Sequence, residues 1–550
     1  MAICRQKKGD KIYLYRYKSV REGKKVKHVF QEYLGIEDKN GNIIKTPKRT
    51  LDKINISNTR FYGAVRLLWE ITQEFEFEKI IDEIAPKRGF KAGKMLTLLA
   101  INRCIDPKSL NKFSYWYDRT YLPQLTNLES KHVNKNNLLS AMDAICGIDA
   151  GDEYDLTLNI EKALFEKYKS KLPADTFSAL YYDITRSIFS GNNCILAFPG
   201  YNPKIKNKKQ INIGLIVTRK HHFPIFHFVF KGNMHDSLTV GKVLSIIKSF
   251  GITNVTIIWD RGMMSFDNMA WLVKHGFNLI TGLKKNLVEC EDIYQEWIVS
   301  ESPEFFIKRF GDGAIYAIGK DRTLNDQKGK LIVYQNTMIR DAERVERNEK
   351  IKAAIIKLKE VAERNKETAE EKVNKILKGI EKYFEISYYQ SNDKIKVNNK
   401  LSTDEITYSA NRDGKFSIFS TDLSMPTEEV IKVYFDKNEI ERTFRIMKQI
   451  MELEPTRHRL SNRVKSYVFV CYLSFLIYSI LEYRIKDLKL DLSVEDVIEK
   501  LNDIEHAEVT YSNQKESRFL NIGKIQKEII NKLQIKDYFL SKDATIDLKM

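Results

Sequence analysis

The sequence predicts an α/β fold, in which a mixed β-sheet flanked by helices is split by a long insertion. Three observations predict it. Between residues 175 and 285, short apolar runs with strand character alternate with helical patterns. From 286 to 414 this order is interrupted, and the charged helical stretch 340–384 predicts that the insertion is largely helical. A strand at 416–419 and long helical patterns then continue to residue 485.

Two further regions precede the sheet and one follows it. Residues 1–57 predict a basic β-hairpin arm, because tyrosines alternate along 11–34 and a turn falls near Gly23. Residues 58–150 show helical apolar stripes with basic loops, which fits a DNA-binding region and equally fits plain helical packing. Residues 486–550 predict a helical C-terminal part with a capped helix that begins at Ser493.

The order of elements within 175–285 narrows the fold further. Three strands, a helix, a strand, a second helix and a last strand follow one another, which is the order of an RNase H-like fold. The strands are expected at 177–184, 211–218, 223–230, 255–259 and 277–283. The catalytic core is therefore expected in two parts, 175–285 and 415–485.

The charge balance favours a polyanionic partner. The chain of 550 residues has 91 Lys and Arg against 73 Asp and Glu, a net charge of +18. Residues 1–50 alone hold 14 basic and 5 acidic residues, which is half of that surplus. A cationic surface attracts nucleic acid and releases its counterions. A general lysine bias would give the same excess, so charge alone leaves both explanations open.

Cysteine usage and hydropathy predict the compartment. The six cysteines form no C-x-x-C pair, which fits a reducing cytosol. The N-terminus has no apolar signal region, and the longest apolar run, the 14 residues 468–481, is short for a bilayer and predicts a buried core helix. No phosphate-binding G-x-x-x-x-G-K-[ST] loop occurs, so no use of ATP is expected. We expect a cytoplasmic protein that associates with the nucleoid when bound to DNA, not with a membrane.

Two aspartates lie at the ends of apolar strands. Asp183 follows YY in the first strand, and Asp260 follows VTIIW in the fourth. A carboxylate at such a rim is costly unless a cation meets it, and Mg²⁺ prefers oxygen ligands of this kind. Each aspartate alone is more simply a solvated loop residue or a helix cap. Two of them on neighbouring strands of one sheet favour a metal site.

A third carboxylate lies on a helix beyond the insertion, in the segment YFDKNEIERTFRIMK. At 100° per residue, a row of charged side chains falls within about 40° of one line, and the row comprises Lys437, Glu441, Arg445 and Lys448. Apart from Glu441 itself, nothing on this face offers the two lysines an acidic partner. An ordinary i,i+4 surface pair between Glu441 and Arg445 is the simpler alternative.

The spacing of this segment resembles a known signature. Tyr434-x2-Lys437-x3-Glu441-x6-Lys448 is similar to the Y-x2-R-x3-E-x6-K motif of insertion-sequence DDE transposases, the group typified by the Tn-five and IS-four elements. The resemblance includes Asp183 and Asp260. It departs at Lys437, where the motif has arginine, so a bidentate phosphate clamp becomes a point charge.

The resemblance implies a function and a set of roles. Asp183, Asp260 and Glu441 would converge to hold two Mg²⁺ ions, for which Mn²⁺ can substitute, in a DNA transposase that cleaves and transfers strands. Tyr434, Lys437 and Lys448 would contact DNA phosphates, and Arg445 joins them by helix geometry alone. The expected partners are the terminal inverted repeats, the target DNA and a second copy of the chain.

Two other functions stay open at this point. A catalytically decayed transposase would act as a DNA-binding repressor, which the intact triad speaks against. An RNase H-like nuclease would hydrolyse DNA without strand transfer, which the basic face around Glu441 speaks against. Trp297 in the insertion is a candidate for stacking on a flipped base, although core packing explains it more simply.

Overall fold

The computed structural model divides the chain into two compact units, which are described separately. The first comprises residues 1–59, 506–520 and 540–550, and the second comprises 60–505 and 521–539. Trp297, Lys87 and Arg88 lie outside the described residues. The structure describes residues 2–8, 11–22, 25–38, 41–44, 54–86, 91–149, 152–191, 193–200, 208–296, 305–310, 312–511 and 514–539.

The first unit contains the expected hairpin. β2 (Lys11–Glu22) and β3 (Lys25–Glu37) pair antiparallel, with Glu22 opposite Lys25. β1 (Ala2–Lys8) and β4 (Ile43–Ile44) complete a sheet in the order β1-β2-β3-β4. Successive side chains along β2 lie on opposite faces, as the alternation predicts. Leu14 is buried on one face, while Tyr15 contacts Tyr33 on the other, with ring centroids 5.4 Å apart.

The second unit begins with the expected helices. α3 is buried along most of its length and packs against α16 (Ser461–Asp487). Of the basic residues expected in the loops, Lys94 donates to the carbonyl of Thr126 at 3.0 Å. The helices are α1 (Gly63–Glu74), α2 (Phe77–Ile84), α3 (Ala92–Ile105), α4 (Leu110–Asp118), α5 (Leu122–Thr126), α6 (Lys135–Ile145) and α7 (Thr157–Lys169).

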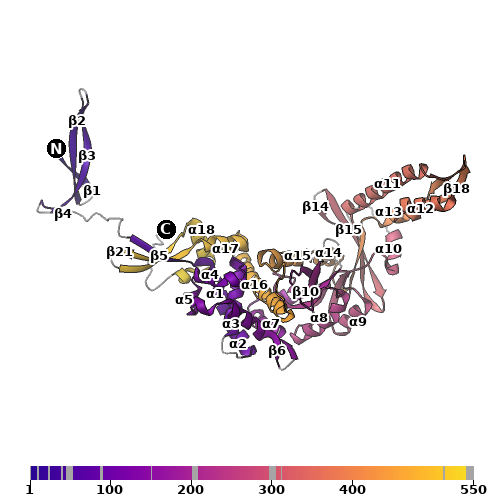
Figure 1. Cartoon of the computed structure of the whole chain (residues 1–550), viewed down its shortest axis with the longest axis horizontal. Coiled ribbons are helices and arrows are strands. Elements are labelled where there is room, and N and C mark those ends of the chain that lie inside the picture. The colour runs from indigo at the N-terminus through magenta and orange to yellow at the C-terminus, as the bar shows by residue number, and fades with distance from the viewer. Residues whose placement is uncertain are drawn as a thin grey trace. The chain divides into compact units, whose positions relative to one another are not determined.

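A large mixed sheet forms the centre of this unit (Figure 1). Its strand order is β11-β10-β8-β12-β13-β20-β16-β15-β14. β8, β12 and β13 run parallel to one another, whereas β10 and β20 pair antiparallel with their neighbours. The predicted elements are confirmed as β8 (Ala179–Ile188), β10 (Lys209–Thr218), β11 (Pro224–Lys231), α8 (Ser237–Ser249), β12 (Thr256–Trp259), α9 (Phe266–Lys274), β13 (Asn278–Gly282) and β20 (Lys415–Ser420).

The insertion is not largely helical, which corrects the expectation from sequence. β14 (Phe306–Phe310), β15 (Gly313–Leu324) and β16 (Gln327–Asn336) extend the central sheet beyond β20. The turn between β15 and β16 consists of Asn325 and Asp326, both with positive φ, as a two-residue hairpin requires. The Asn-Asp pair was the sequence signal for this hairpin. The strands themselves were missed because polar residues interrupt the apolar alternation of β15.

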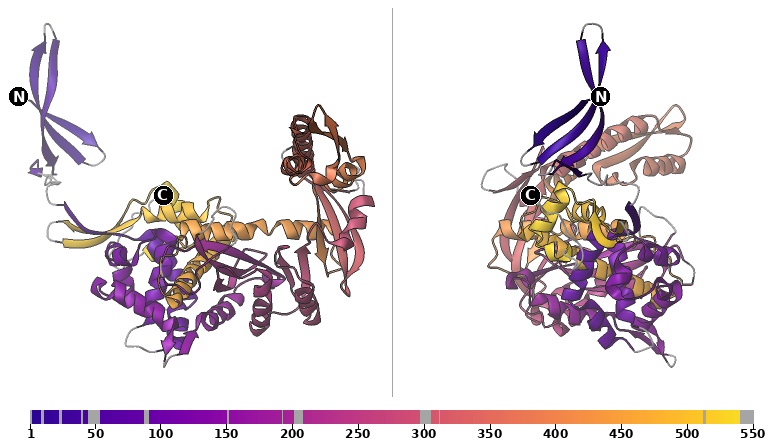
Figure 2. Two further views of the ribbon diagram at one scale, coloured as in Figure 1. Left: turned by 45° about the vertical axis from the view of Figure 1, so that its right-hand side comes forward. Right: turned by 90° about the vertical axis from the view of Figure 1, so that its left-hand side faces the viewer.

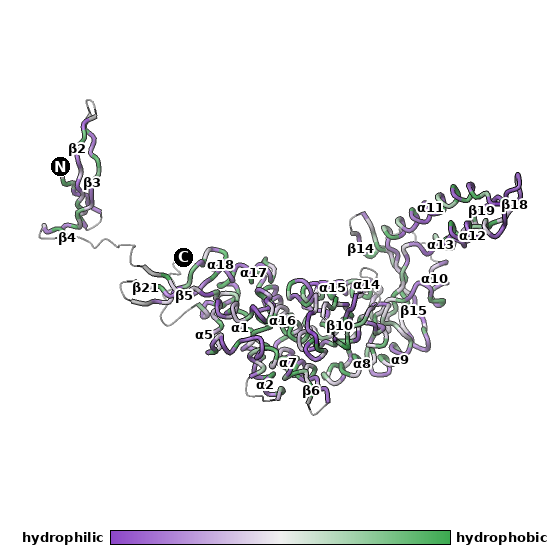
Figure 3. Tube along the Cα trace, viewed as in Figure 1, coloured by the Kyte–Doolittle hydropathy of each residue, from purple (hydrophilic) through white to green (hydrophobic). Residues whose placement is uncertain are grey.

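The helical arm within the insertion carries its own small sheet (Figure 2). α11 (Thr337–Lys359) and α12 (Lys366–Leu377) pack on strands β17 (Ala362–Glu363), β18 (Phe384–Ser391) and β19 (Lys394–Leu401), and α13 (Thr403–Arg412) returns the chain to the central sheet. One side of α11 is apolar and lies inside this module, where Ile351, Ala354 and Leu358 are buried. Hydrophilic residues predominate on the remaining faces of α11 and α12 (Figure 3), although Met338, Val345 and Ile356 of α11 are exposed.

Three helical segments follow β20. α14 (Thr427–Phe435) leads to α15 (Asn438–Arg445), which continues into a π-helical turn, Ile446–Ile450. Among the described residues, α16 is the one helix long and apolar enough to cross a membrane, and 89% of its most apolar stretch is buried inside the protein, as in a core helix.

The C-terminal part is less purely helical than expected. The capping box of Ser493 and Asp496 at the start of α17 (Val494–Asn502) is confirmed, and α18 (Lys524–Lys532) follows later in the chain. Between these helices, however, β21 (Glu505–Tyr511) and β22 (Gln514–Leu520) form a sheet with β5 (Ile54–Phe61).

Candidate active site

Asp183 and Asp260 lie level with each other on adjacent strands. In the parallel pair of β8 and β12, Ile258 is opposite Tyr181, so two residues further along, Asp260 comes opposite Asp183. Neighbouring strands are about 4.8 Å apart. β12 ends at Trp259, whereas β8 continues to Ile188, so Asp260 begins a loop beside the middle of β8. The expected adjacency of the two aspartates is therefore present.

The alternation of side chains along β8 shows which face Asp183 occupies. The hydroxyl of Tyr182 pairs with Thr239 of α8, whereas the hydroxyl of Tyr181 donates to the carbonyl of Val433 in α14. Asp183 follows Tyr182 in the same regular strand, so it shares the face of Tyr181. α8 and α9 cover the opposite face of the sheet (Figure 1). Asp183 therefore faces the α14–α15 side.

Asp260 is held from the same side, through one of its two oxygens. Oδ1 accepts from the backbone N–H of Arg261 at 2.8 Å and from the Tyr434 hydroxyl at 3.2 Å, and the Lys437 ammonium lies 2.8 Å away. Burial alone would raise the pKa of Asp260, but the Lys437 ammonium and these hydrogen bonds bring that pKa below its ordinary value. Oδ2 receives no hydrogen bond from the described residues and is available to a further cation.

Asp183 has the opposite electrostatic character. Burial raises the pKa of this carboxyl to about 7, and the neighbouring charges of Asp260 and Asp236 act in the same direction. Its backbone hydrogen bond and the Lys437 ammonium oppose that rise without cancelling it. Two carboxylates side by side thus have their pKa values pushed apart, an arrangement that a divalent cation would relieve.

Glu441 lies on α15 between two lysines that reach the same part of the sheet. Lys437, one turn earlier, contacts Asp260, and Lys448, two turns later, donates to the carbonyl of Arg186 in β8 at 2.7 Å. Lys437 precedes the first residue of α15 and Lys448 lies in the π-helical turn after it, so the three residues do not form one α-helical row, and the direction of Glu441 toward this edge stays a prediction. Glu441 is exposed and has no hydrogen bond or ion pair within the described part of the chain, so the surface pair with Arg445 is not formed.

Two expectations about the basic face need correction. Each lysine has an acidic partner other than Glu441, because Lys437 pairs with Asp260, and Lys448 lies 3.4 Å from Glu454. Asp260 is distant in the sequence, and Glu454 lies in the irregular segment after the π-helical turn, where helix geometry does not apply. Tyr434 is only 7% exposed, and its hydroxyl is used on Asp260, so the structure gives it a positioning contact in place of the expected contact with DNA. Arg445 is exposed, as expected of a residue that contacts DNA.

Sequence reasoning missed two contributors to this site. A Cβ on Gly282, at the end of β13, would lie 2.3 Å from the Tyr434 hydroxyl, so glycine leaves the space in which this hydroxyl reaches Asp260. Asp236, at the start of α8, receives Nη2 of Arg186 at 3.0 Å on both carboxylate oxygens. In the sequence Asp236 looks like a helix cap, and nothing there indicates its proximity to Asp183.

The donor set fits a hard divalent ion, although the structure does not close it into a complete cluster. Asp183, Asp260 and Glu441 offer only carboxylate oxygens, which Mg²⁺ and Mn²⁺ prefer, and Oδ2 of Asp260 is unused. Among the described residues, no three Asp, Glu, His or Cys side chains are close enough to share an ion. The convergence of Glu441 with the two aspartates therefore stays a prediction.

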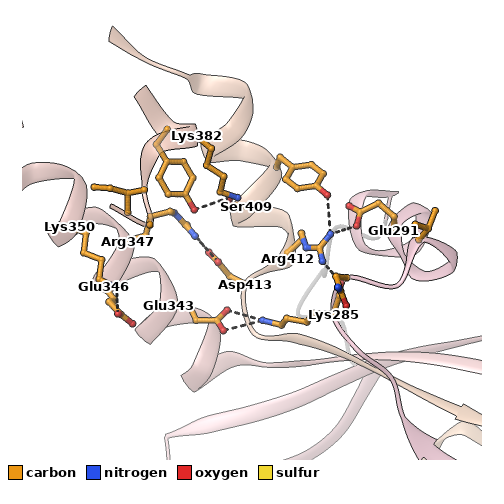
Figure 4. A pocket seen from close by; sticks show the side chains of 16 residues that line it. Lys285, Glu291, Glu343, Glu346, Arg347, Lys350, Lys382, Ser409, Arg412 and Asp413 are labelled. Atoms are coloured by element: carbon orange, nitrogen blue, oxygen red, sulfur yellow. Dashed lines mark hydrogen bonds and ion pairs between the residues drawn. The ribbon is translucent and has the colours of Figure 1, made fainter. Parts of the chain in front are cut away.

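A second charged region lies in the insertion (Figure 4). A pocket of about 680 Å³ opens between α11, α13 and the loop after β13. Its charged side chains largely neutralise one another and connect the helical module to the central sheet. The ion pairs are Arg347 with Asp413, Arg412 with Glu291, and Lys285 with Glu343.

Comparison with known proteins identifies the family. Residues 195–477, just over half of the chain, match the transposase DDE domain family. The chain belongs to this family, which implies polynucleotidyl transferase activity. The matched range contains Asp260 and Glu441, and Asp183 lies just before it. No curated protein matches the chain.

Three solved structures are also similar to the chain. The piggyBac transposase synaptic complex with hairpin DNA is 10% identical, with a TM-score of 0.38 over 80% of this chain and 78% of that one. The Mos1 transposase paired-end complex with left transposon end is 11% identical, with a TM-score of 0.15 over 35% and 59%. The Mos1 strand transfer complex is 10% identical, with a TM-score of 0.14 over 35% and 58%. Because these TM-scores are all below 0.5, the family assignment rests on the sequence match.

Proposed function

We propose that this protein is a DNA transposase of the Tn-five/IS-four type, which cleaves transposon ends and joins them to target DNA. The observation that carries the proposal is the pair Asp183 and Asp260, adjacent on parallel strands and facing the helix that carries Glu441. The four-point spacing from Tyr434 to Lys448 supports the subtype, with lysine in place of arginine at 437.

Asp183, Asp260 and Glu441 are the residues that would hold two Mg²⁺ ions. When bound, such ions activate a water or a 3′-hydroxyl and stabilise the leaving oxygen of an in-line phosphoryl displacement. Tyr434 and Lys437 fix Oδ1 of Asp260, so the free Oδ2 has a defined direction. Ionisation of Asp183 is disfavoured without a cation, so this residue contributes most of the pH dependence of ion binding.

The basic residues beyond Glu441 would hold the DNA strand. Arg445 is exposed one turn after Glu441, and Lys448 follows in the π-helical turn. Both can neutralise backbone phosphates and contribute to affinity without reading sequence. The partners in this proposal are the terminal inverted repeats, the target DNA and a second copy of the chain, in a cytoplasmic protein that associates with the nucleoid through DNA.

The test of the proposal is Asp260→Asn, assayed on DNA that carries the inverted repeats flanking the gene. The substitution keeps the shape of the side chain and removes the charge that attracts the ion. We expect cleavage in Mg²⁺ to fall to background, while the affinity for the same DNA without metal stays close to that of the wild type. Asp267→Asn is the matched control, because Asp267 is an exposed aspartate in the first turn of α9, and this variant should cleave normally.

The assay also separates the alternatives. A transposase joins the freed 3′-hydroxyl to a second DNA, whereas a nuclease leaves only cut products, and a repressor binds without cutting. Cleavage by Asp260→Asn at the wild-type rate would remove this residue from the mechanism. Cleavage without any joined product would favour the nuclease.

A further inference from the structure

A basic pocket opens beyond the catalytic face, at the segment that connects α15 to α16. Its volume is about 530 Å³, and its walls come from α3, α4, α6, the start of α16 and the connecting segment. The basic residues of its lining come from three separate parts of the chain, one of which, residues 457–463, holds three of them. They are Arg103, Lys135, Arg457, Arg459 and Arg463.

Several of these positive charges are not compensated. Arg457, Arg459 and Lys135 are exposed, and none of them forms an ion pair within the described residues. Arg463 differs, because it donates two hydrogen bonds to Asp143, at 2.9 and 2.7 Å. Glu452 and Glu454 are the acidic residues of the lining, so the basic residues outnumber the acidic ones.

Arg103 gives the pocket a buried donor without a partner. Its side chain is about 5% exposed, and its guanidinium lies over the ring of Tyr467 at 5.3 Å. Nη2 donates to the carbonyl of Lys108 at 2.8 Å, and Nη1 is 3.6 Å from Glu452. Nε is buried and has no hydrogen-bond partner. A buried N–H of this kind is costly unless an acceptor enters the pocket.

Two helices begin at the pocket and reinforce its positive potential. Leu110 is the first residue of α4, Lys135 is the first residue of α6, and both line the pocket. The hydroxyl of Ser109, which precedes α4, makes no capping hydrogen bond, and the N–H of Lys112 donates to the carbonyl of Ser109 at 2.9 Å. The N–H groups of Leu110 and Asn111 have no partner within the described residues and can bind an anion. Burial lowers the pKa of His458, in the same lining, to about 4, and the charges of Arg103 and Arg463 add to this effect.

The pocket continues from the proposed catalytic face. Glu454 in its lining lies 3.4 Å from Lys448, and the N–H of Thr456 donates to the carbonyl of Ile188 at the end of β8. Asp183 and Ile188 are five residues apart on this strand, or about 17 Å. That length corresponds to roughly five nucleotide steps along a DNA strand.

We propose that this pocket binds backbone phosphates of the DNA strand that lies across the catalytic face. Arg457 and Arg459 supply exposed cations, the first turn of α4 supplies N–H donors, and Arg103 supplies a buried donor from the lining. The contacts are to phosphate and carry no base information. This inference rests on the proposed function, because it takes DNA as the occupant.

The test is the double variant R457A/R459A of the full-length chain, titrated with a 30-base-pair duplex of arbitrary sequence in EDTA. Each phosphate contact contributes about 0.9 to the slope of log affinity against log salt. We therefore expect the slope to fall by about two units and the affinity at 0.1 M salt to weaken roughly 50-fold. R457K/R459K keeps the charges and should retain most of the slope.

The control K248A/K274A removes two exposed lysines from α8 and α9, which cover the opposite face of the sheet. Its slope should equal that of the wild type. An unchanged slope in R457A/R459A, or an equal loss in the control, would overturn the inference. Thermal stabilisation by inorganic phosphate is measured on the same variant. If R457A/R459A loses this stabilisation but binds duplex normally, the occupant of the pocket is a free anion and the inference is overturned.

Failure of the proposed function would look different. A wild-type chain that binds duplex with the expected slope, but never cleaves the flanking repeats in Mg²⁺, would contradict the transposase assignment and leave the pocket as a DNA contact. A wild-type chain that binds no duplex would overturn both.

Discussion

In the insertion, Arg347 donates to both oxygens of Asp413 at 2.7 Å, whereas beside the catalytic face Arg457 and Arg459 have no acidic partner in the part of the chain that the structure describes. The two regions are similar in composition, since each combines arginines, lysines and carboxylates around a pocket. They differ in how completely those charges are paired. In the insertion each of the charges on Arg347, Arg412 and Lys285 has an acidic partner, although Nε of Arg347, like Nε of Arg103, has no hydrogen bond within the described residues. The catalytic side keeps a Glu441 and an Asp260 Oδ2 that have no partner in the described part of the chain.

The difference shows why counting charges does not locate a functional site. A closed network holds two structural elements together, and its removal costs stability. An open one is costly to the folded protein and is relieved when a ligand supplies the missing charge. We therefore expect substitutions in the insertion network to act on folding, and substitutions on the catalytic side to act on binding and chemistry.

The largest stability effect is expected from Asp413→Ala. The side chains of Arg347 and Asp413 are 9% and 5% exposed, so the substitution leaves a nearly buried guanidinium without its partner. Breaking such a pair costs about 3–5 kcal/mol. Urea denaturation should show this loss, and Glu346→Ala is the control, because its pair with Lys350 is exposed and its removal should leave the free energy of unfolding almost unchanged.

The comparison would fail if Asp413→Ala melted like the wild type, because the insertion pair would then be no more structural than a surface pair. It would also fail if the variant kept its stability and lost part of the salt dependence of DNA binding. In that case the insertion pocket, not the catalytic side, would carry a phosphate contact.

A smaller effect is expected from Asp183→Asn in the metal-free protein. The pKa of Asp183 is about 7 in the folded state, against about 4 in an unfolded chain. Because the folded state holds this proton more tightly, the group favours folding fully below pH 4, and that contribution is lost as the pH rises through 7. Asparagine does not titrate, so the variant should lack this loss.

The measurement is the free energy of unfolding at pH 5 and pH 8 in EDTA. The difference in the free energy of unfolding between wild type and variant should change by on the order of 1–3 kcal/mol between pH 5 and pH 8. The wild type should be the less stable of the two at pH 8. Other groups that titrate in this range, such as Glu161, are the same in both proteins and cancel. Mg²⁺ should protect the wild type more than the variant at pH 8. If the free energy of unfolding changed equally in wild type and variant between pH 5 and pH 8, Asp183 would not be the uncompensated carboxylate described above.

The molecule also shows how much of its fold and of its candidate site can be predicted from the sequence. The sheet was predictable because its strands are apolar runs bounded by turn residues, and Asp183 and Asp260 came with it as the charged ends of such runs. Of the predicted helix row, only Glu441 and Arg445 lie within α15, because Lys437 precedes this helix and Lys448 lies in the π-helical turn that follows it. All of these signals lie within one element or between consecutive elements.

The parts that could not be predicted depend on contacts between distant segments. Lys437 meets Asp260 across 177 positions, and the space for the Tyr434 hydroxyl depends on Gly282 in another strand. The strands β14–β16 were missed because partly exposed strands lose their alternation. The convergence of Glu441 with the aspartates depends on how α15 packs over β8, which no local pattern specifies.

The smallest effect is expected from Lys448→Ala. This variant also tests most directly whether a charged residue belongs to a paired structural network or to the DNA-binding side. The sequence alone predicts that this variant melts like the wild type and loses one phosphate contact. The structure adds a hydrogen bond from Lys448 to the carbonyl of Arg186 and a partly buried pair with Glu454. We therefore expect both a loss of about 0.5–1.5 kcal/mol in the free energy of unfolding and a reduction of the salt slope by about one unit. A urea melt beside a salt titration in EDTA measures the two separately. A lowered stability with an unchanged slope would make Lys448 a structural lysine, like those of the insertion network, and would move the start of the DNA path from Lys448 to Arg457 and Arg459.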